Sequence, residues 1–171
     1  MSDLRQAVLE TPIGPIGVTV GPAGVRRVSW LRRGTSVVEH ASESSRADDD
    51  VLVAAVAQLR DYFTGSLREF TVPVDLESLT PSTRRVLLVL QEVPYGTSVT
   101  YGELAELSGT GLPARAIGAV MGANPVPIVI ACHRVLAGDG LGGYSGGLPG
   151  QGLETKRWLL EHEGILSPRL W

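Results

Sequence analysis

The single cysteine of this 171-residue chain is followed directly by a histidine, in the pair Cys132-His133. A thiol acts as a nucleophile through its thiolate form, and a nearby imidazole can generate that form by taking the proton. Neighbouring residues of an extended chain point to opposite sides. His133 therefore needs a turn at Cys132, or a bridging water, to act on the sulfur. For this pair alone, an inert structural thiol remains the alternative interpretation.

Composition limits the other kinds of chemistry. A lone cysteine permits neither an internal disulfide nor a thiolate-rich zinc site, and the histidines at positions 40, 133 and 162 are too scattered to suggest a metal cluster. We therefore expect no metal and no soluble cofactor. No apolar run approaches the roughly 18 residues that cross a bilayer, and the N-terminus lacks a signal-peptide pattern. These features predict a cytoplasmic protein without a membrane partner.

The charge distribution bears on nucleic-acid binding, which relies on neutralising phosphates. The net charge is −3, which argues weakly against it. The acidic excess lies in residues 1–79, with eight Lys or Arg against eleven Asp or Glu, whereas residues 80–171 carry seven of each. A small DNA interface on the C-terminal half is therefore compatible with the composition.

The N-terminal part is predicted to combine strands with one helix. Asp50 is placed to cap that helix, and a domain boundary is expected near Leu79. The expected elements are strands over 8–20 and 25–31 joined by a turn at 21–24, a polar loop over 39–50, a helix over 51–63 ended by 64–66, and an extended stretch over 70–76.

The C-terminal part is predicted to be mainly helical. Thr100 and Glu103 have the spacing of a capping box, in which each side chain satisfies a free amide at a helix start. The helices are expected from Pro81 to before Pro94, from Thr100 to about Leu107, from Pro113 to about Gly122, and from Gly152 to Glu163. In the last of these we expect Leu153, Trp158 and Leu160 to be buried and Gly164 to form the C-cap.

The second and third of these helices are joined by a short glycine-containing turn. Such a pair is typical of a helix-turn-helix. A plain helical hairpin fits the same pattern, so these residues alone leave DNA binding open.

A series of short motifs occurs in one order along the C-terminal half. They resemble the O6-alkylguanine-DNA alkyltransferases (methylated-DNA–protein-cysteine methyltransferases) over residues 80–165, and less closely over 8–79. The motifs are Tyr95-Gly96, Thr100-Tyr101-Gly102, Ala114-Arg115-Ala116-Ile117-Gly118, Asn124-Pro125, Cys132-His133-Arg134-Val135, Tyr144-Ser145-Gly146-Gly147, Trp158-Leu159-Leu160 and His162-Glu163-Gly164.

The resemblance implies an α+β fold. A small N-terminal α/β domain of the RNase H-like kind, residues 1–79, would pack on a mainly helical domain, residues 80–171, that holds the helix-turn-helix and the active site. It also implies a monomeric repair protein for double-stranded DNA. The protein would move an alkyl group from guanine O6, or from thymine O4, onto its own Cys132 in a single irreversible turnover. The target atom is inaccessible inside a duplex, so the nucleotide would be flipped out.

The resemblance further assigns roles within the site. His133 would take the thiol proton through a water molecule, and Glu163 would orient the imidazole and stabilise its charged form, following the logic of hydrolytic triads. The remaining residues would surround the base: Tyr101 donating to guanine N3, the Ser145 amide holding O6, the carbonyls of Cys132 and Val135 accepting from the exocyclic amine, Tyr144 and Pro127 forming the pocket wall, and Asn124 fixing the turn before the active-site strand.

A second set of roles concerns the DNA. Arg115 would fill the place that the flipped base leaves in the stack. Small residues on the same helix, Ala114 and Gly118 among them, would allow close approach to the minor groove. Such a binder contacts mostly phosphates and sugars, so little sequence preference is expected.

The chain departs from the family pattern at a few positions. Ala131 replaces the usual proline before the cysteine and is expected to loosen the placement of Cys132. Ser82 and Leu87 replace an aromatic residue and a tryptophan, and residues 148–155 form a longer loop. Two alternatives are a non-catalytic lesion sensor, a class that lacks the reactive cysteine, and a helix-turn-helix regulator, a class that usually carries an additional metal-binding module.

Overall fold

The computed structural model describes residues 4–34 and 46–170. The chain divides into two compact units, one within Met1–Ser78 and the other within Leu79–Trp171. Each unit has its own buried apolar residues. Across the described ranges, none of the helices combines the length and the apolar character required to span a bilayer.

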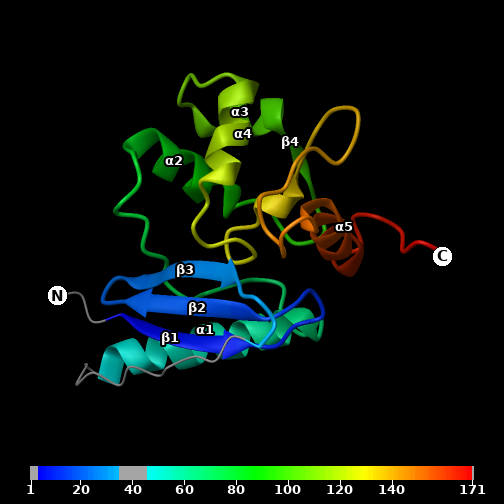
Figure 1. Cartoon of the computed structure of the whole chain (residues 1–171). Helices are drawn as coiled ribbons and strands as arrows, with labels where there is room; N and C mark the ends of the chain where they lie inside the picture. Colours follow the sequence, from blue (N-terminus) through cyan, green and yellow to red (C-terminus); the bar gives the residue numbers. More distant parts are fainter. Residues whose placement is uncertain (1–3, 35–45, 171) are drawn as a thin grey trace. The chain divides into compact units, whose positions relative to one another are not determined.

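The first unit is a three-stranded antiparallel sheet with one long helix on it. The helix, α1 (Arg46–Phe63), contacts all three strands and lies along the sheet (Figure 1). Leu59 and Tyr62 of this helix are fully buried, and the sheet contributes Ile16 and Val18 to the same core. The strands are β1 (Arg5–Leu9), β2 (Ile16–Gly21) and β3 (Gly24–Trp30), in that spatial order.

The predicted turn between the last two strands is confirmed. Gly24 occupies it with φ +132°, and a Cβ at this position would lie 2.4 Å from the Pro73 carbonyl oxygen. Val25 hydrogen-bonds with the extended segment around Val74. Glycine is therefore required here both by the backbone conformation and by the close approach of this segment.

Two expectations for this unit need correction. The apolar segment 8–20 is not one strand but the end of β1 and most of β2, separated by a turn in which Gly14 N–H donates to the Thr11 carbonyl. Asp50 does not cap α1, because the helix begins at Arg46 and includes residues 46–50 of the predicted loop. Acidic residues in a first turn are favoured by the helix dipole, so this polar run can continue the helix. Residues 39–45 lie outside the described residues.

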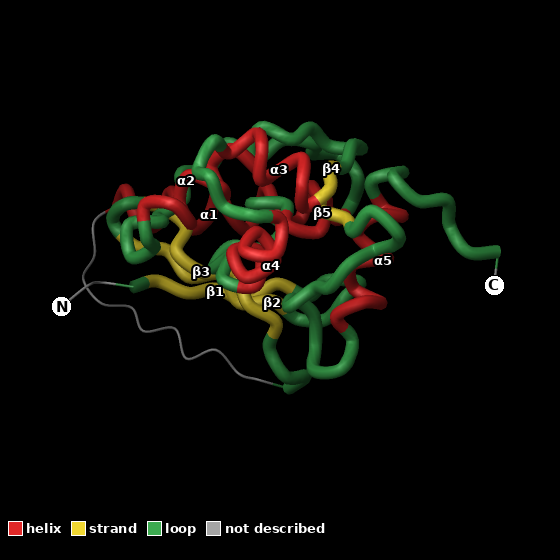
Figure 2. The backbone as a smooth tube through the Cα atoms, turned by 90° about the horizontal axis from the view of Figure 1, so that it is seen from above, coloured by secondary structure: helices red, strands yellow, loops and turns green. Residues whose placement is uncertain are grey.

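The second unit is mainly helical, with a minimal parallel sheet (Figure 2). Helices α3 and α4 pack against each other and against α2, and α5 packs against the short 3-10 helix η1. The elements are α2 (Pro81–Leu90), β4 (Val99–Thr100), α3 (Tyr101–Ser108), α4 (Ala114–Gly122), η1 (Cys132–Arg134), β5 (Val135–Leu136) and α5 (Gly152–His162).

The helix ends follow the sequence closely. Thr100 and Glu103 form both hydrogen bonds of the predicted capping box, and Gly109 ends α3 in the left-handed conformation. Gly164, with φ 76°, follows α5 as predicted. The expectation that Leu153 is buried is wrong. It is 56% exposed, because it lies in the first turn of α5 and borders an open hollow that the preceding loop lines.

Candidate active site

The two-residue sheet brings distant parts of the chain together. Val99 of β4 pairs with Val135 of β5 in parallel. Tyr101, which opens α3, directly follows β4, and the η1 turn with Cys132 directly precedes β5. This pairing therefore places the aromatic ring and the thiol, thirty-one positions apart in the sequence, on neighbouring segments.

The turn that the Cys132-His133 pair requires is present. Residues Cys132–Arg134 form a 3-10 helix, with the Arg134 N–H donating to the Ala131 carbonyl at 3.0 Å. Because the pair lies in a helical turn and not in a strand, the side chains of Cys132 and His133 do not point to opposite faces. Ala131 has φ −79°, a value that the proline ring also accepts, so a proline at this position would not require a change of φ.

Asn124 holds the turn that leads to the cysteine. Its side-chain amide donates to the Ile130 carbonyl at 2.9 Å, and its side-chain oxygen accepts from the Val126 N–H at 3.0 Å. Inside this turn Ile128 is fully buried with φ 73°. A β-branched residue rarely adopts this conformation, so tight packing must hold it there. The hydrogen bonds of Asn124 and the packing of Ile128 therefore fix the conformation of the segment before Cys132.

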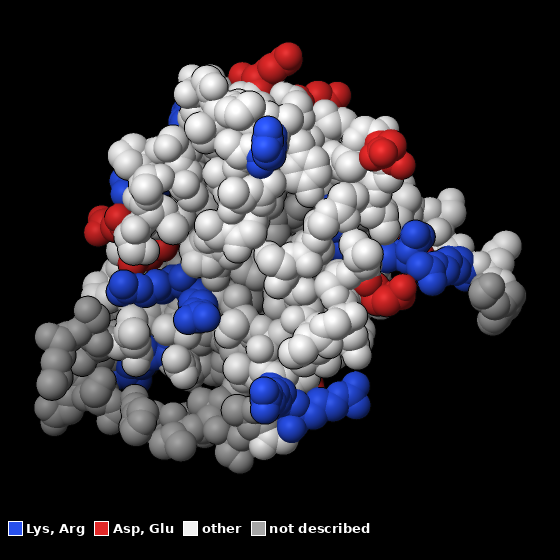
Figure 3. Space-filling model, turned by 45° about the horizontal axis from the view of Figure 1, so that its top comes forward, with Lys and Arg blue, Asp and Glu red and all other residues white. Residues whose placement is uncertain are grey.

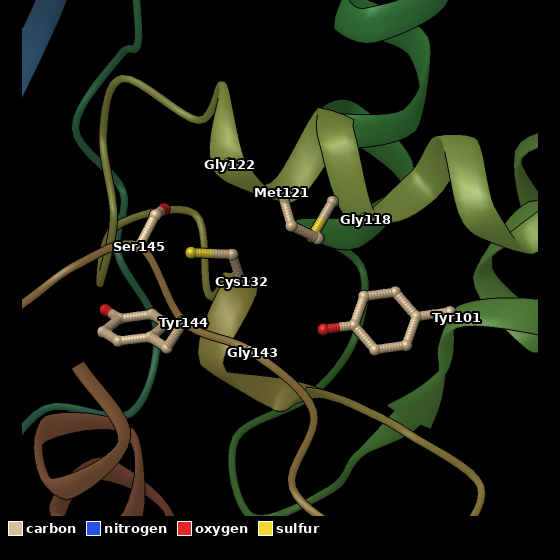
Figure 4. Close-up of a pocket in the computed structure, with 8 residues that line it drawn as sticks. All are labelled: Tyr101, Gly118, Met121, Gly122, Cys132, Gly143, Tyr144 and Ser145. Atoms are coloured by element: carbon tan, nitrogen blue, oxygen red, sulfur yellow. The ribbon is translucent and has the colours of Figure 1, made fainter.

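Cys132 borders a cavity of about 380 Å³. The thiol is 5% exposed. In the view of Figure 4, Tyr101 and Tyr144 lie on either side of it, and residues of α4 border the same space. The volume is within the range of small-molecule sites. The lining residues are Tyr101, Gly118, Met121, Gly122, Cys132, Gly143, Tyr144 and Ser145.

Behind the cysteine, a buried network is centred on Glu163. His133 is completely buried, and its Nε2 hydrogen-bonds with Glu163 Oε2. Arg134 Nε donates to Glu163 Oε1 at 2.8 Å, and another of its nitrogens donates to the Val93 carbonyl at 2.7 Å. The Gly96 N–H also donates to Oε1, at 3.2 Å. One carboxylate therefore joins the cysteine turn to the segment before β4.

The surroundings set the protonation states of this network. Burial alone would raise the pKa of Glu163, but the hydrogen bond from His133 and the charge of Arg134 outweigh it and lower the pKa to about 2. Burial lowers the pKa of His133. Glu163 is therefore ionised and His133 neutral at neutral pH, so Nε2 carries the hydrogen and donates to the carboxylate. Nδ1 has no hydrogen-bond partner among the described residues and remains a base.

The cysteine itself is stored as a thiol. Burial raises its pKa from 9.0 to about 11, and the Asn124 amide and the charge of Lys156 oppose this shift only in part. A base is therefore required for the sulfur to act as a nucleophile near neutral pH.

The loop that carries Tyr144 and Ser145 depends on two close glycine contacts. A Cβ on Gly152 would lie 2.5 Å from the Tyr144 carbonyl oxygen. A Cβ on Gly147, where φ is +86°, would lie 2.6 Å from the Thr155 hydroxyl. The glycines thus let the loop lie directly on the start of α5, next to a second, more open cavity of about 730 Å³.

The structure brings together most of the residues expected at the site. Cys132, Tyr101, Tyr144 and Ser145 line one cavity, with Gly118 beside them, and His133 meets Glu163. Others lie nearby without lining the cavity: Asn124 in the preceding turn, buried Pro127 in the same turn, and Val135 directly after η1.

Sequence reasoning missed part of the site. Met121 and Gly122 could have been found, since they follow Gly118 at the spacing of one helix face. Gly143 adjoins Tyr144. Arg134 stood in the motif around Cys132 without an assigned role, and Lys156 gave no motif signal. Each binds a main-chain carbonyl, which the sequence does not display. Within the described ranges, no group of three or more His, Cys, Asp or Glu side chains is arranged to hold a metal.

The helix expected to approach DNA exposes small side chains and one cation. Ala114 and Arg115 are exposed in the first turn of α4, and Gly118 is exposed one turn further on. On the face drawn in Figure 3, basic side chains are scattered rather than gathered in one dense patch. Such a distribution predicts modest electrostatic attraction to phosphates.

Comparison with known families covers both units of the chain. The DNA-binding domain of 6-O-methylguanine DNA methyltransferases matches residues 81–165, and the ribonuclease-like domain of the same proteins matches residues 4–76. The chain belongs to the methylated-DNA–protein-cysteine methyltransferase family. The predicted family and α+β fold are confirmed, with a ribonuclease-like domain followed by a DNA-binding domain.

Individual relatives also match almost the whole length of this chain. The methylated-DNA–protein-cysteine methyltransferase of Mycobacterium bovis is 37% identical, over 96% of this chain and 95% of its own length. The Homo sapiens protein of that name is 35% identical over 95% of this chain and 81% of its own.

Solved structures agree with the sequence comparison. The Mycobacterium tuberculosis O6-methylguanine methyltransferase has a TM-score of 0.75 at 35% identity, covering 96% of this chain and 95% of that one. The M. tuberculosis protein has also been solved in complex with DNA, with a TM-score of 0.73 at 35% identity and coverage of 92% and 91%. The chain is therefore a DNA-binding methyltransferase of DNA repair.

Proposed function

We propose that this protein repairs O6-alkylguanine in double-stranded DNA by transferring the alkyl group to Cys132 in a single irreversible turnover. The thiolate sulfur attacks the alkyl carbon, so that an S–C bond forms and the bond from carbon to O6 breaks. The product is a thioether, which ordinary thiol chemistry does not reverse. Residues 80–171 would carry both DNA binding and chemistry, and residues 1–79 would be a structural domain.

The proton path follows from the network behind the cysteine. His133 is neutral and buried, and its free Nδ1 would accept the thiol proton through a water molecule. The ionised Glu163 then stabilises the imidazolium, as the orienting acid does in a hydrolytic triad. The electron pair of the broken bond remains on guanine, which is neutralised by a proton delivered towards the base.

Recognition of the flipped base would use the cavity beside Cys132. Tyr101 would donate its hydroxyl to guanine N3, and the Ser145 amide would hold O6. The carbonyls of Cys132 and Val135 would accept from the exocyclic amine, with Tyr144 and Pro127 as walls. Burial raises the pKa of Tyr101, which keeps its hydroxyl protonated and able to donate.

The DNA contacts of this proposal lie on α4. Arg115 would occupy the gap left in the base stack, and the small side chains at Ala114 and Gly118 would let the helix backbone approach the minor groove. The single observation that carries the proposal is the position of the only thiol, which lines a cavity of about 380 Å³ with a His–Glu pair behind it.

The test is transfer of an isotopically labelled methyl group from O6-methylguanine in a duplex. The label is expected on Cys132, located by mass spectrometry of the digested protein, and Cys132→Ala should abolish it. A duplex with O4-methylthymine run in parallel measures the second substrate. Label that stays on the DNA with folded wild-type protein refutes the activity, and tight lesion binding without transfer would instead indicate a lesion sensor.

A further inference from the structure

Lys156 is the only lysine in the chain, and it is buried. It lies on α5 with none of its surface exposed. All other basic residues of the sequence are arginines or histidines. Lysine is almost never fully buried without a partner, since removing an ammonium group from water is costly.

The partners of this ammonium group are main-chain carbonyls. Lys156 Nζ donates to the Val135 carbonyl at 2.7 Å and to the Gly143 carbonyl at 3.0 Å. No Asp or Glu of the described residues forms an ion pair with it. Val135 directly follows the η1 turn of Cys132, and Gly143 lines the Cys132 cavity. The lysine therefore joins the two segments that border the cavity.

The groups facing Lys156 are those of the candidate site. Its Nζ lies 6.0 Å from the centre of the Tyr101 ring. Its charge interacts with Cys132, whose pKa it lowers, and with His133, whose pKa it also lowers. The positive charge thus favours the thiolate, and it adds to the effect of burial in keeping the neighbouring imidazole neutral. These are the two conditions that a thiol–base pair needs.

We propose that Lys156 is a positioning residue for the transfer reaction, fixing the Val135 and Gly143 carbonyls beside the cavity and supplying the positive charge that stabilises the Cys132 thiolate as it forms. This inference rests on the proposed function only in taking Cys132 as the nucleophile. A purely structural lysine would hold the two carbonyls together but would leave the reactivity of the thiol independent of its charge.

Thiol reactivity measured without DNA separates these two roles. Iodoacetamide needs no base-binding pocket, and a chain with one cysteine reports only Cys132 in an intact-mass assay. Lys156→Gln keeps a hydrogen-bond donor but removes the charge, and it should slow alkylation at neutral pH about tenfold, equivalent to raising the pKa of Cys132 by one unit. Lys156→Arg keeps the charge and should retain most of the rate. Arg157→Gln removes a charge from the same helix, where the side chain faces Glu161, and should change nothing.

The pH profile gives a second, sharper readout. Burial lowers the pKa of Lys156 from 10.5 to about 8. The wild-type rate should rise with pH and flatten near pH 8, where the lysine loses its charge. The profiles of Lys156→Gln and Lys156→Arg should lack this bend. Among the described groups of the site that are named here, no other one accounts for it. The pKa values of His133 and Glu163 are lowered, those of Tyr101 and Tyr144 are raised above 10.0, and that of Cys132 is about 11.

Methyl transfer from O6-methylguanine DNA completes the experiment, with circular dichroism confirming that each variant is folded. Lys156→Gln should slow transfer by the same factor as alkylation. The inference is overturned if Lys156→Gln coincides with wild type, if Lys156→Arg is as slow as Lys156→Gln, or if the wild-type profile has no bend near pH 8. A wild-type protein that fails to accept methyl from DNA would refute the proposed function, while the alkylation series would still decide how Lys156 acts on Cys132.

Discussion

Glu163 is a single carboxylate shared by two buried side chains, His133 and Arg134. In the proposed reaction its charge would act through His133, because an imidazolium that forms in a buried site needs a compensating negative charge. The amide of glutamine has nearly the same shape but no charge, and its NH₂ group can present a donor to His133 in place of an acceptor. The wrong tautomer of His133 would then be favoured.

We therefore predict that Glu163→Gln slows methyl transfer at least about 100-fold, the usual contribution of a positioned general base. Single-turnover measurement with excess protein gives the rate. Glu161→Gln is the matched control, since it removes a charge from the same helix at a side chain that faces Arg157 and not the site. Equal rates for wild type and Glu163→Gln would show that the charge of Glu163 does not assist proton transfer to His133.

Residue identities predicted the main chemical groups of the site but not how they meet. The Cys132-His133 pair was visible in the sequence, whereas the 3-10 turn that lets both residues serve one site was only a requirement. Lys156 could not be assigned a role, because its partners are main-chain carbonyls at positions 135 and 143. Main-chain acceptors have the same chemistry at every residue and leave no motif.

At the level of elements, the loop before α5 can lie close to the helix only because Gly147 and Gly152 have no side chains. Gly152 approaches the Tyr144 carbonyl so closely that even one methyl group would lie 2.5 Å from that oxygen. The loop must move if Gly152 becomes alanine, since backbone cannot yield as a flexible side chain can. Tyr144 and Ser145 would move with it, away from the cavity that they line.

We expect Gly152→Ala to reduce the rate of methyl transfer about tenfold or more, because small misplacements of positioning groups are costly to a reaction. Gly138→Ala is the control, as a Cβ there meets nothing within 4 Å. A Gly152→Ala protein that is as fast as wild type would show that the loop position does not limit the reaction.

Helix α4 combines an exposed arginine with exposed small residues, and the proposed role of Arg115 in base flipping can be tested separately from the transfer chemistry. Arg115→Ala should slow transfer from duplex DNA about tenfold, because the energy of unstacking the target base is no longer offset by the inserted side chain. It should leave reaction with the free base O6-benzylguanine unchanged, since no base must be flipped. Equal losses on both substrates would contradict a role in flipping.

Element boundaries were predictable where local chemistry decides them, as at the Thr100–Glu103 capping box. They were not predictable where polar residues can be either loop or helix. The start of α1 at Arg46 is such a case, since a run of aspartates is equally suited to a first helical turn. The burial of Leu153 was not predictable for a similar reason. Helical spacing shows which side chains share a face, but not whether another element packs against the first turn of the helix.

For the whole molecule, the Glu163 network predicts a particular acid sensitivity. The pKa of Glu163 is lowered from 4.5 to about 2 in the folded protein. The unfolded chain therefore binds a proton more readily, and the stabilisation by this carboxylate is complete above about pH 4.5 and is lost as pH falls towards 2. Burial of neutral His133 acts in the same direction below pH 6.5.

Urea unfolding at a series of pH values measures this effect. The free energy of unfolding should fall between pH 4.5 and pH 2 for wild type, and less steeply for Glu163→Gln, which has no carboxylate to protonate at this position. Parallel curves for the two proteins would show that other groups dominate acid unfolding. The helices of the second unit followed from the sequence, whereas the coupling between the cysteine turn and the end of α5 was expected only from the family resemblance, because it depends on tertiary contacts.

The storage of the sulfur as a shielded, protonated thiol has a consequence for the lifetime of the protein. Oxidants attack thiolates far faster than thiols, and oxidation beyond the sulfenic acid is not reversed by ordinary reductants. This chain has no second cysteine that could trap a sulfenic acid as a disulfide. With a pKa of about 11, Cys132 is expected to react slowly with peroxide. Under the proposed single turnover, each molecule would then keep its one equivalent of reactivity until it binds a lesion.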